Sequence, residues 1–394
     1  MPGHGTMRAA PTIDIGAIER ELRALWKDSA ADPAASGNAV TRALTLNLVA
    51  RATDSAMAEQ VSAVAQSLTA SHPNRTVLAV MRPDEPEPRL EAFVQANCLL
   101  TAPGVPQLCG EQVTIEAHGA ATGQVASLVL PLLVPDLPVV LWLPGPAPFD
   151  DPLLPRLRGV IDRLIVDSRE FTSPARDLAA MVAFEAAEAP GPGGGPRPPA
   201  LSDLAWTSLT PWRELTAQFF DTRPLLPHLH RIDQVEIRYV PGPGRPNTLL
   251  GLLMAGWLAS CLGWAPLEDA VSVEGRGLRL HLRRPAVGVG PGAIRLVTVD
   301  VRPDERPGAT VGLSALHLRA VDGVLADFSV VLSDEPGYAL TTAEIAGHAT
   351  VRRLARCEQL SPGDLLAAEL RLLSRDRTFG AALRAAGAFA ARLG

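Results

Sequence analysis

Three residues of the first half of the chain could together hold an anionic ligand. Asp167-Ser168 follows the apolar run Arg163–Val166, where a strand of an α/β sheet would end, and such sheets bind ligands beyond the carboxyl ends of their strands. Guanidinium groups bind phosphate and carboxylate groups well, so Arg75 and Arg163 could supply the positive charge. The sequence thus suggests an anion site made of Arg75, Arg163 and Ser168. The alternative is a helix cap at Ser168 or Asp167 and ordinary surface arginines.

Other patterns that carry chemistry are incomplete. His228-Leu-His230, with Asp233 nearby, has the reach of a metal pair but lacks a third ligand. Cys98 and Cys109 have no evident activating histidine, so structural thiols are the simpler interpretation. No G-x-G-x-x-G follows the first predicted strand and no G-x-S-x-G occurs, so dinucleotide binding and hydrolase chemistry lack their motifs. We therefore expect no catalytic residues, no cofactor and no metal.

The stretch 202–221, Ser-Asp-Leu-Ala-Trp-Thr-Ser-Leu-Thr-Pro-Trp-Arg-Glu-Leu-Thr-Ala-Gln-Phe-Phe-Asp, gathers four aromatic residues directly after a Pro/Gly-rich spacer. Ser202 and Thr210 are spaced as N-caps of two short helices, and Pro211 would occupy the first helical position of the second. This segment could clamp two domains together or bind a partner, because its aromatic side chains face two directions. The residues that we expect at a partner surface are Trp206, Trp212, Arg213, Glu214, Gln218, Phe219 and Phe220.

Composition limits the class of protein. The chain has 394 residues, 47% of them hydrophobic, which is enough for two or three globular domains. The net charge is −6 and the charges are interspersed, so nucleic acid is not an expected partner. Neither a signal peptide nor an apolar run of about 20 residues is visible, and four scattered cysteines predict no disulfide framework. We expect a cytoplasmic protein that does not bind membranes.

Hydrophobic periodicity divides the chain into four parts. Residues 1–39 predict a helix and a connector, and 40–188 alternate strand and helix patterns, which is typical of an α/β domain with a mostly parallel sheet and flanking helices. Residues 189–200 form a linker rich in proline and glycine. Residues 201–394 predict an α+β domain that begins with the aromatic segment and continues as an antiparallel meander, closed by helices near 342–346 and 361–373.

Several short motifs resemble those of one family. They are Arg42-Ala-Leu-Thr-Leu-Asn-Leu48, His72-Pro-Asn-Arg75, Cys109-Gly-Glu-Gln112, Leu132-Leu-Val-Pro-Asp-Leu-Pro138 with Trp142, Asp162-Arg-Leu-Ile-Val-Asp-Ser168, and Pro211-Trp-Arg-Glu214 with Gln218-Phe-Phe-Asp221. In these motifs the chain resembles the OpcA family, the glucose-6-phosphate dehydrogenase assembly proteins of actinobacteria and cyanobacteria. The resemblance spans most of the chain. After about residue 240 it rests on the overall layout of the sequence more than on short motifs.

The resemblance implies a non-catalytic protein that binds glucose-6-phosphate dehydrogenase. Such a protein would promote the active oligomer of the enzyme and act as its allosteric activator, and so support the oxidative pentose phosphate pathway and the supply of NADPH. Two alternatives remain: an enzyme or sensor that binds a sugar phosphate in the α/β domain, and a scaffold whose binding leaves the kinetics of the dehydrogenase unchanged.

Overall fold

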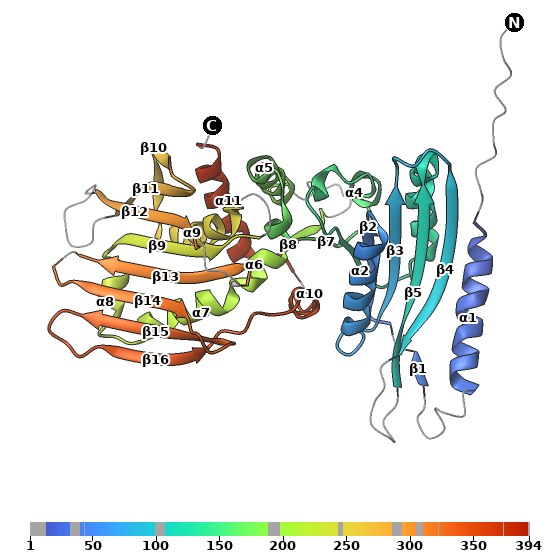
Figure 1. The fold of residues 1–394 in the computed structure, drawn as a ribbon, viewed down its shortest axis with the longest axis horizontal. Coiled ribbons are helices and arrows are strands. Elements are labelled where there is room, and N and C mark those ends of the chain that lie inside the picture. The colour runs from blue at the N-terminus through green and yellow to red at the C-terminus, as the bar shows by residue number, and fades with distance from the viewer. Residues whose placement is uncertain are drawn as a thin grey trace, which may run out of the picture.

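The computed structural model describes residues 13–31, 40–42, 44–98, 107–187, 198–242, 247–285, 294–304, 310–321, 323–372 and 374–392. Two eight-stranded sheets lie at opposite ends of an elongated molecule, with several helices between them (Figure 1). No helix within these ranges is long and apolar enough to cross a membrane.

Sheet A is mostly parallel and has the strand order β1-β5-β3-β2-β6-β7-β8, with β4 antiparallel to β5. Its central strands are buried on both faces, as expected of a parallel sheet covered by helices. The predicted α/β architecture is confirmed. The strands of sheet A are β1 (Val40–Arg42), β2 (Leu46–Ala52), β3 (Asn74–Arg82), β4 (Arg89–Cys98), β5 (Gln107–His118), β6 (Val139–Trp142), β7 (Arg163–Val166) and β8 (Ala200–Asp203).

Helices cover both faces of sheet A. On one face, apolar side chains of α1 (Ile15–Ala31), α3 (Val125–Leu132), α4 (Leu153–Leu157) and α5 (Pro174–Glu185) join the core of the strands. On the other face, α2 (Ser55–Leu68) begins at Asp54, whose side chain accepts a hydrogen bond from the N–H of Met57. Such a cap satisfies one of the free N–H groups of a helix start.

Sheet B has the strand order β10-β11-β12-β9-β13-β14-β15-β16 and is antiparallel except between β12 and β9. The predicted α+β architecture is therefore confirmed. Along β9, buried residues alternate in part with more exposed ones, as expected of a sheet with one covered face. The strands of sheet B are β9 (Ile232–Val240), β10 (Ala265–Glu274), β11 (Gly277–Pro285), β12 (Ile294–Pro303), β13 (Gly312–Ala320), β14 (Ala326–Leu332), β15 (Tyr338–Ile345) and β16 (Val351–Arg356).

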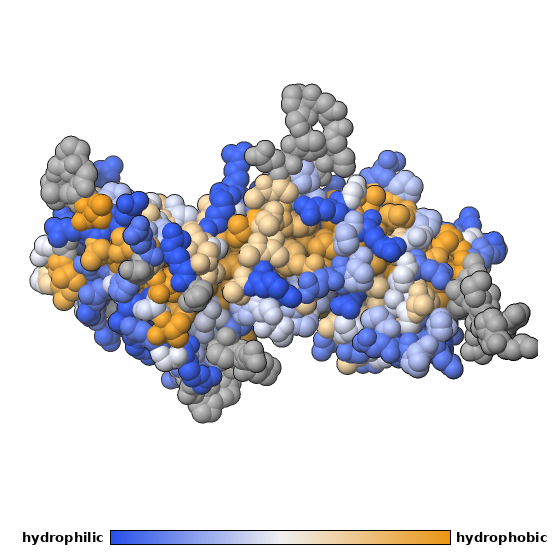
Figure 2. Space-filling view, turned by 90° about the horizontal axis from the view of Figure 1, so that it is seen from above, coloured by the Kyte–Doolittle hydropathy of each residue, from blue (hydrophilic) through white to orange (hydrophobic). Residues whose placement is uncertain are grey.

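The covered face of sheet B packs against α9 (Leu249–Leu262), which is buried almost all round. Helix α11 (Arg377–Ala390) in turn packs closely on α9 and also contacts α5. The short helices α6 (Leu204–Ser208) and α7 (Thr210–Gln218) continue this layer toward sheet A, whereas α8 (Leu226–Leu229) lies at the end of sheet B away from sheet A (Figure 1). Viewed from above, hydrophilic and hydrophobic residues are interspersed over both ends of the molecule, and mildly hydrophobic residues gather in the middle (Figure 2).

The two halves of the chain interlock. Strand β8 follows the linker but pairs in parallel with β7, so sheet A extends past the boundary that we expected at residue 200. Helix α10 (Pro362–Leu370) lies near the end of the chain, yet its Leu365 and Leu366 join the apolar cluster of β2 and α2. One face of sheet A is therefore covered by residues from both ends of the chain.

Three local predictions are wrong. The helix expected near 342–346 is part of strand β15, because the alternation of Ala339, Thr341 and Ala343 as buried residues continues sheet B. The cap expected at Ser202 is instead Asp203, whose carboxylate accepts from the N–H of Ala205, since Ser202 lies in β8. Thr210 likewise is the first residue of α7 rather than its N-cap.

Candidate functional site

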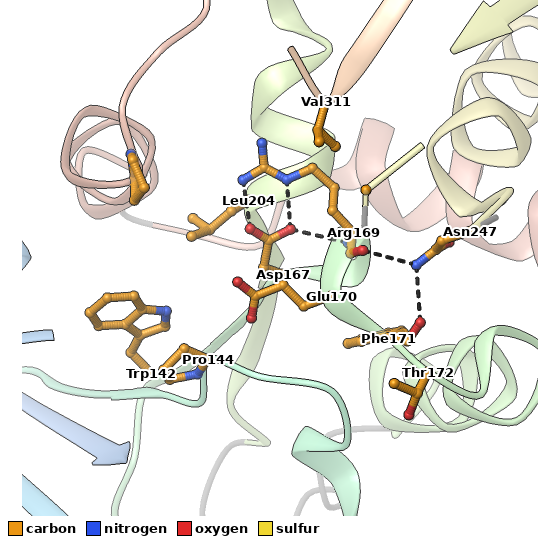
Figure 3. Close-up of a pocket in the computed structure, with 12 residues that line it drawn as sticks. Trp142, Pro144, Asp167, Arg169, Glu170, Phe171, Thr172, Leu204, Asn247 and Val311 are labelled. Atoms are coloured by element: carbon orange, nitrogen blue, oxygen red, sulfur yellow. Dashed lines mark hydrogen bonds and ion pairs between the residues drawn. The ribbon is translucent and has the colours of Figure 1, made fainter. Parts of the chain in front are cut away.

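A cavity of about 680 Å³ opens beyond the carboxyl ends of β6, β7 and β8 (Figure 3). It lies near the point where the order of sheet A reverses: the chain moves from β2 to β3 on one side and later returns to β6 on the other. Ligands of open α/β sheets usually bind at this place. The cavity is lined by Trp142, Pro144, Asp167, Arg169, Glu170, Phe171, Thr172, Leu204, Gly242, Asn247, Val311 and Pro362, so both halves of the chain contribute to it.

The charged side chains that line this cavity already make hydrogen bonds or ion pairs within the protein. Arg169 donates to Asp167 through Nε at 2.8 Å and Nη2 at 2.5 Å. Glu170 accepts the N–H of Gly145 at 2.6 Å, and its pKa is raised by burial and by the neighbouring carboxylate of Asp167. Asn247 donates to the carbonyl oxygen of Ser168 at 2.6 Å and thereby joins the start of α9 to the end of β7.

A buried carboxyl group lies directly behind the cavity. Asp203 accepts the N–H of Ser168 at 2.9 Å and its hydroxyl at 2.6 Å. Burial first, and then the charge of Asp167, raise the pKa of Asp203 to about 7. The carboxyl groups of Asp167, Glu170 and Asp203 outnumber the single arginine, which is itself paired with Asp167, so this edge offers no free positive charge to an anionic ligand among the residues that line the cavity.

Trp142 gives the cavity one unused hydrogen-bond donor. Its ring is 4% exposed, and its buried Nε1 has no hydrogen-bond partner among the described residues. A buried N–H group without a partner costs free energy. The sequence could not indicate this donor, because whether a buried N–H group finds a partner depends on the tertiary fold.

The three residues of the expected anion site do not come together. Arg75 lies at the amino end of β3, where it donates to Glu111 at 2.8 Å and to Glu19 at 2.7 Å. Arg163 lies at the amino end of β7, which is separated from β3 by the two strands β2 and β6, and Ser168 follows the carboxyl end of β7. Ser168 is fully buried and donates its hydroxyl to Asp203. Arg75 and Ser168 are therefore already hydrogen-bonded to carboxyl groups of the protein.

Arg163 instead joins the two halves of the chain. Its Nη1 donates to the hydroxyl of Ser202 at 2.6 Å, and its Nη2 donates to the carbonyl oxygens of Leu372 at 2.6 Å and Ser374 at 3.0 Å. Such a guanidinium group bridges segments that would otherwise leave backbone acceptors unpaired.

Trp206 is the internal anchor of the aromatic segment. Its ring packs against Phe379 of α11 with 5.6 Å between centroids, and its Nε1 donates to Asp376 at 2.9 Å. The guanidinium group of Arg213 lies 3.6 Å from the centre of the same ring, a cation–π contact. Trp206 is 2% exposed, so this end of the segment belongs to the core between the sheets.

The rest of the segment is divided between core and surface. Trp212 and Phe220 are buried, and Phe220 packs 5.0 Å from Phe328 of β14. Phe219 is half-buried against the same ring, whereas Glu214 and Gln218 are exposed. Of the residues predicted at a partner surface, Glu214 and Gln218 are thus exposed, whereas Arg213 and Phe219 are half-buried.

The exposed side of this segment borders a small apolar groove of about 260 Å³. We call it the β16 groove, because β16 forms its outer wall. It is lined by Leu215, Gln218, Phe219, Thr222, Leu225, Thr341, Ala343, Ile345, Ala349, Val351 and Arg353. Sequence reasoning found Gln218 and Phe219 but missed the opposite wall, since a helix was expected at 342–346 and no strand at 351–356.

Comparisons with known proteins agree with this two-part architecture. The family model described as the glucose-6-phosphate dehydrogenase subunit N-terminal domain matches residues 65–183, and the model of the C-terminal domain of that subunit matches residues 199–383. Together the two matches cover well over half of the chain, and the second begins at β8.

Three similar proteins carry the name OpcA. The relative from Synechocystis is 30% identical over 208 residues, which are 52% of this chain and 41% of that protein. The relative from Nostoc punctiforme is 32% identical over 180 residues, 45% of this chain and 36% of the relative. The relative from Synechococcus elongatus is 28% identical over 300 residues, 74% of this chain and 62% of the relative.

In each case the match spans less than two thirds of the length of the relative. All three organisms are cyanobacteria, so these relatives give no support to the actinobacterial part of the resemblance. Because the two family models cover both halves of the chain in order, the chain belongs to the OpcA family.

Proposed function

We propose that the chain is a non-catalytic assembly factor and allosteric activator of glucose-6-phosphate dehydrogenase. The observation that carries this proposal is the match of both family descriptions, each of which names a subunit of that enzyme, to consecutive parts of the chain. The names of the relatives link OpcA to the OxPP cycle. By promoting the active oligomer, the protein would support this pathway and its supply of NADPH.

The cavity at the carboxyl edge of sheet A supports a non-catalytic role. Asp167, Arg169 and Glu170 are held in ion pairs or hydrogen bonds within the protein. A catalytic acid or base must be free to reach a substrate. The arrangement of these groups suits a junction that fixes the two halves of the chain relative to each other.

The proposal assigns the contact with the dehydrogenase to the β16 groove. Strand β16 ends the order of sheet B, so its outer backbone groups can pair with an added strand. Val351 is 58% exposed and Leu354 is 51% exposed, and Phe219 supplies an aromatic wall. Partly exposed apolar and aromatic residues of this kind are typical of the centre of an interface.

Charge favours one kind of occupant. Arg352, Arg353 and Arg356 lie on β16, and within the described residues they make surface contacts with Glu344, Gln218 and Glu358. Surface ion pairs contribute little free energy and can be exchanged. We therefore propose that the groove binds a segment of the dehydrogenase that presents apolar side chains flanked by acidic ones.

Activation follows if the chain binds one state of the enzyme more tightly than another. A ligand shifts a conformational or assembly equilibrium only by its difference in affinity for the two states, and about 1.4 kcal/mol of difference gives a tenfold shift. By reciprocity, the substrate that favours the active state should strengthen the complex.

The groove can be tested with one matched pair of variants. Val351→Asp introduces a negative charge at the β16 groove, and Val273→Asp introduces the same charge at the opposite edge strand, where Val273 is 68% exposed. We expect Val351→Asp to weaken binding of the dehydrogenase at least about tenfold, because an unpaired charge in an interface is costly, and Val273→Asp to bind like the wild type. Biolayer interferometry with the immobilised enzyme measures both.

The possible outcomes distinguish an error about the binding site from an error about the proposed function. Normal binding by Val351→Asp would exclude the β16 groove but leave the partner unchanged. Absence of any complex with the wild-type chain would contradict the proposed function itself. Equal unfolding midpoints of the two variants, measured in urea, would show that the introduced charge acts on binding and not on folding.

A further inference from the structure

A second cavity of about 520 Å³ lies at the opposite, amino edge of sheet A. The starts of β2, β6, β7 and β8 form its floor, and the segment between α10 and α11 closes it from the other half of the chain. It is lined by Thr45, Leu46, His72, Pro138, Val140, Asp162, Arg163, Pro198, Ala200, Leu370, Arg371, Leu372, Ser374 and Arg375.

The lining of this cavity is basic, although the chain as a whole is acidic. It contains Arg163, Arg371, Arg375 and His72 but a single carboxylate, Asp162. That carboxylate accepts the backbone N–H of Val139 at 2.8 Å and is therefore already hydrogen-bonded. This cavity therefore differs from the cavity at the carboxyl edge of sheet A, where carboxyl groups outnumber arginine.

The three arginines differ in how many hydrogen bonds and ion pairs their side chains already make within the protein. Arg163 is bound to Ser202 and to two carbonyl oxygens, and Glu369 lies 4.0 Å behind it. Arg375 donates to the carbonyl oxygens of Glu185, Pro198 and Pro199, with the carboxylate of Glu185 at 3.7 Å. These two groups hold the walls of the cavity in place.

Arg371 is available for a ligand. Its side chain makes no ion pair or hydrogen bond to any residue that the structure describes, and it lies beside the cavity with His72. Because both residues line the cavity, Arg371 and the imidazole of His72 can act on a common ligand. Burial and the charge of Arg371 also lower the pKa of His72. The Nδ1 atom of His72 contacts the hydroxyl of Ser71 at 3.0 Å, which leaves Nε2 for another partner.

We propose that this cavity binds a phosphate group, free or as part of a small phosphorylated metabolite, with Arg371 as the main contact. Arg375 and His72 complete the site, and Arg163 adds positive charge from its floor. A guanidinium group suits this ligand because its planar N–H groups match phosphate oxygens in pairs. The volume lies within the range of small-molecule sites and leaves space for an organic part next to the phosphate.

Such a ligand would join the two halves of the protein. His72 and Arg163 belong to the sheet A part, whereas Arg371 and Arg375 follow α10. A bound dianion would bridge the two parts and stabilise their packing, since any ligand of the folded state raises its stability. This inference does not depend on the dehydrogenase, because it concerns the chain alone.

Isothermal titration calorimetry at low ionic strength tests the site with three probes: inorganic phosphate, glucose 6-phosphate and glucose. We expect saturable binding of at least one of the two phosphates and none of glucose. Arg371→Gln should weaken the binding about tenfold, because it removes a charge-assisted contact. The matched control is Arg223→Gln, since Arg223 is also exposed and has no ion pair within the described ranges; it should bind like the wild type.

Each outcome decides the proposal. Tighter binding of glucose 6-phosphate than of inorganic phosphate supports an esterified ligand, and equal binding supports recognition of the phosphate group alone. No saturable binding of either phosphate, or equal affinities of Arg371→Gln and the wild type, would overturn the site. An unchanged urea midpoint of Arg371→Gln ensures that a loss of affinity does not reflect unfolding.

Discussion

Asp203 shows how one residue links the two halves of the chain. Its carboxyl group is fully buried, accepts hydrogen bonds from Ser168 and Ala205, and has a pKa raised to about 7. The usual value in an unfolded chain is about 4, so between these values the folded state binds more protons than the unfolded state. Ionisation of Asp203 therefore lowers the free energy of unfolding as the pH rises from about 4 to 7.

Asp203→Asn removes this dependence but can keep the hydrogen bonds. The amide oxygen can accept from both N–H groups, and the amide nitrogen can donate to the hydroxyl of Ser168. Between pH 5 and 8 the wild type should lose about 2 kcal/mol more stability than the variant, since one pKa unit corresponds to about 1.4 kcal/mol. Urea unfolding of both proteins at the two pH values measures the difference. Parallel pH profiles would contradict a raised pKa at this residue.

Residue types alone indicated some functional positions and misled at others. Glu214, Gln218 and Phe219 were expected at a partner surface, and they are the accessible part of the aromatic segment. Trp206 and Trp212 belong to the core, and the sequence left both interpretations open because buried and interfacial aromatics share the same helical spacing. Arg371 could not be recognised, because its role depends on a segment that returns to sheet A long after β8, the last strand of that sheet.

Among the elements, the strands with strong alternation and the long amphipathic or apolar helices were predictable. Strand β7, for example, lies at the expected range Arg163–Val166. Strand β16 was not predicted, because it is exposed along nearly its whole length and shows no apolar alternation. Strand β8 was not predicted either, since its pairing with β7 is a long-range contact that local pattern does not reveal.

Helix α11 packs on α9 through a close approach at Gly256. A Cβ atom at this residue would lie 2.3 Å from the carbonyl oxygen of Ala382 and 3.1 Å from the backbone nitrogen of Ala386. Gly256→Ala should therefore separate the helices and lower the free energy of unfolding by about 1–3 kcal/mol. Gly123→Ala is the control, because nothing lies within 4 Å of its Cβ position. Equal urea midpoints for both variants would contradict this packing.

At the scale of the whole molecule, the two sheets depend on shared elements. Helix α10 covers β2 and α2 of sheet A, and β8 joins the linker to the same sheet. Arg163 and Asn247 add hydrogen bonds between the halves. Neither half can bury its full core without residues from the other, so cooperative behaviour is expected.

Thermal unfolding should accordingly occur in one transition. Leu366 is fully buried between α10 and sheet A, and Leu366→Ala should lower the stability of the whole chain by about 2–5 kcal/mol, because it opens a cavity in the core. Scanning calorimetry should give a single peak for both proteins, shifted to lower temperature in the variant. Two separate peaks, or a shift of only part of the transition, would show that the halves unfold independently.

The central claim concerns the effect of the whole molecule on its partner. The most direct measurement is the initial rate of glucose-6-phosphate dehydrogenase from the same organism across substrate concentrations, with and without this chain, together with the mass of the mixture by light scattering. We predict a heavier complex and a lower apparent KM or a higher kcat. A heavier complex with unchanged kinetics would contradict activation and favour a scaffold, and unchanged mass and rate would contradict the assembly function.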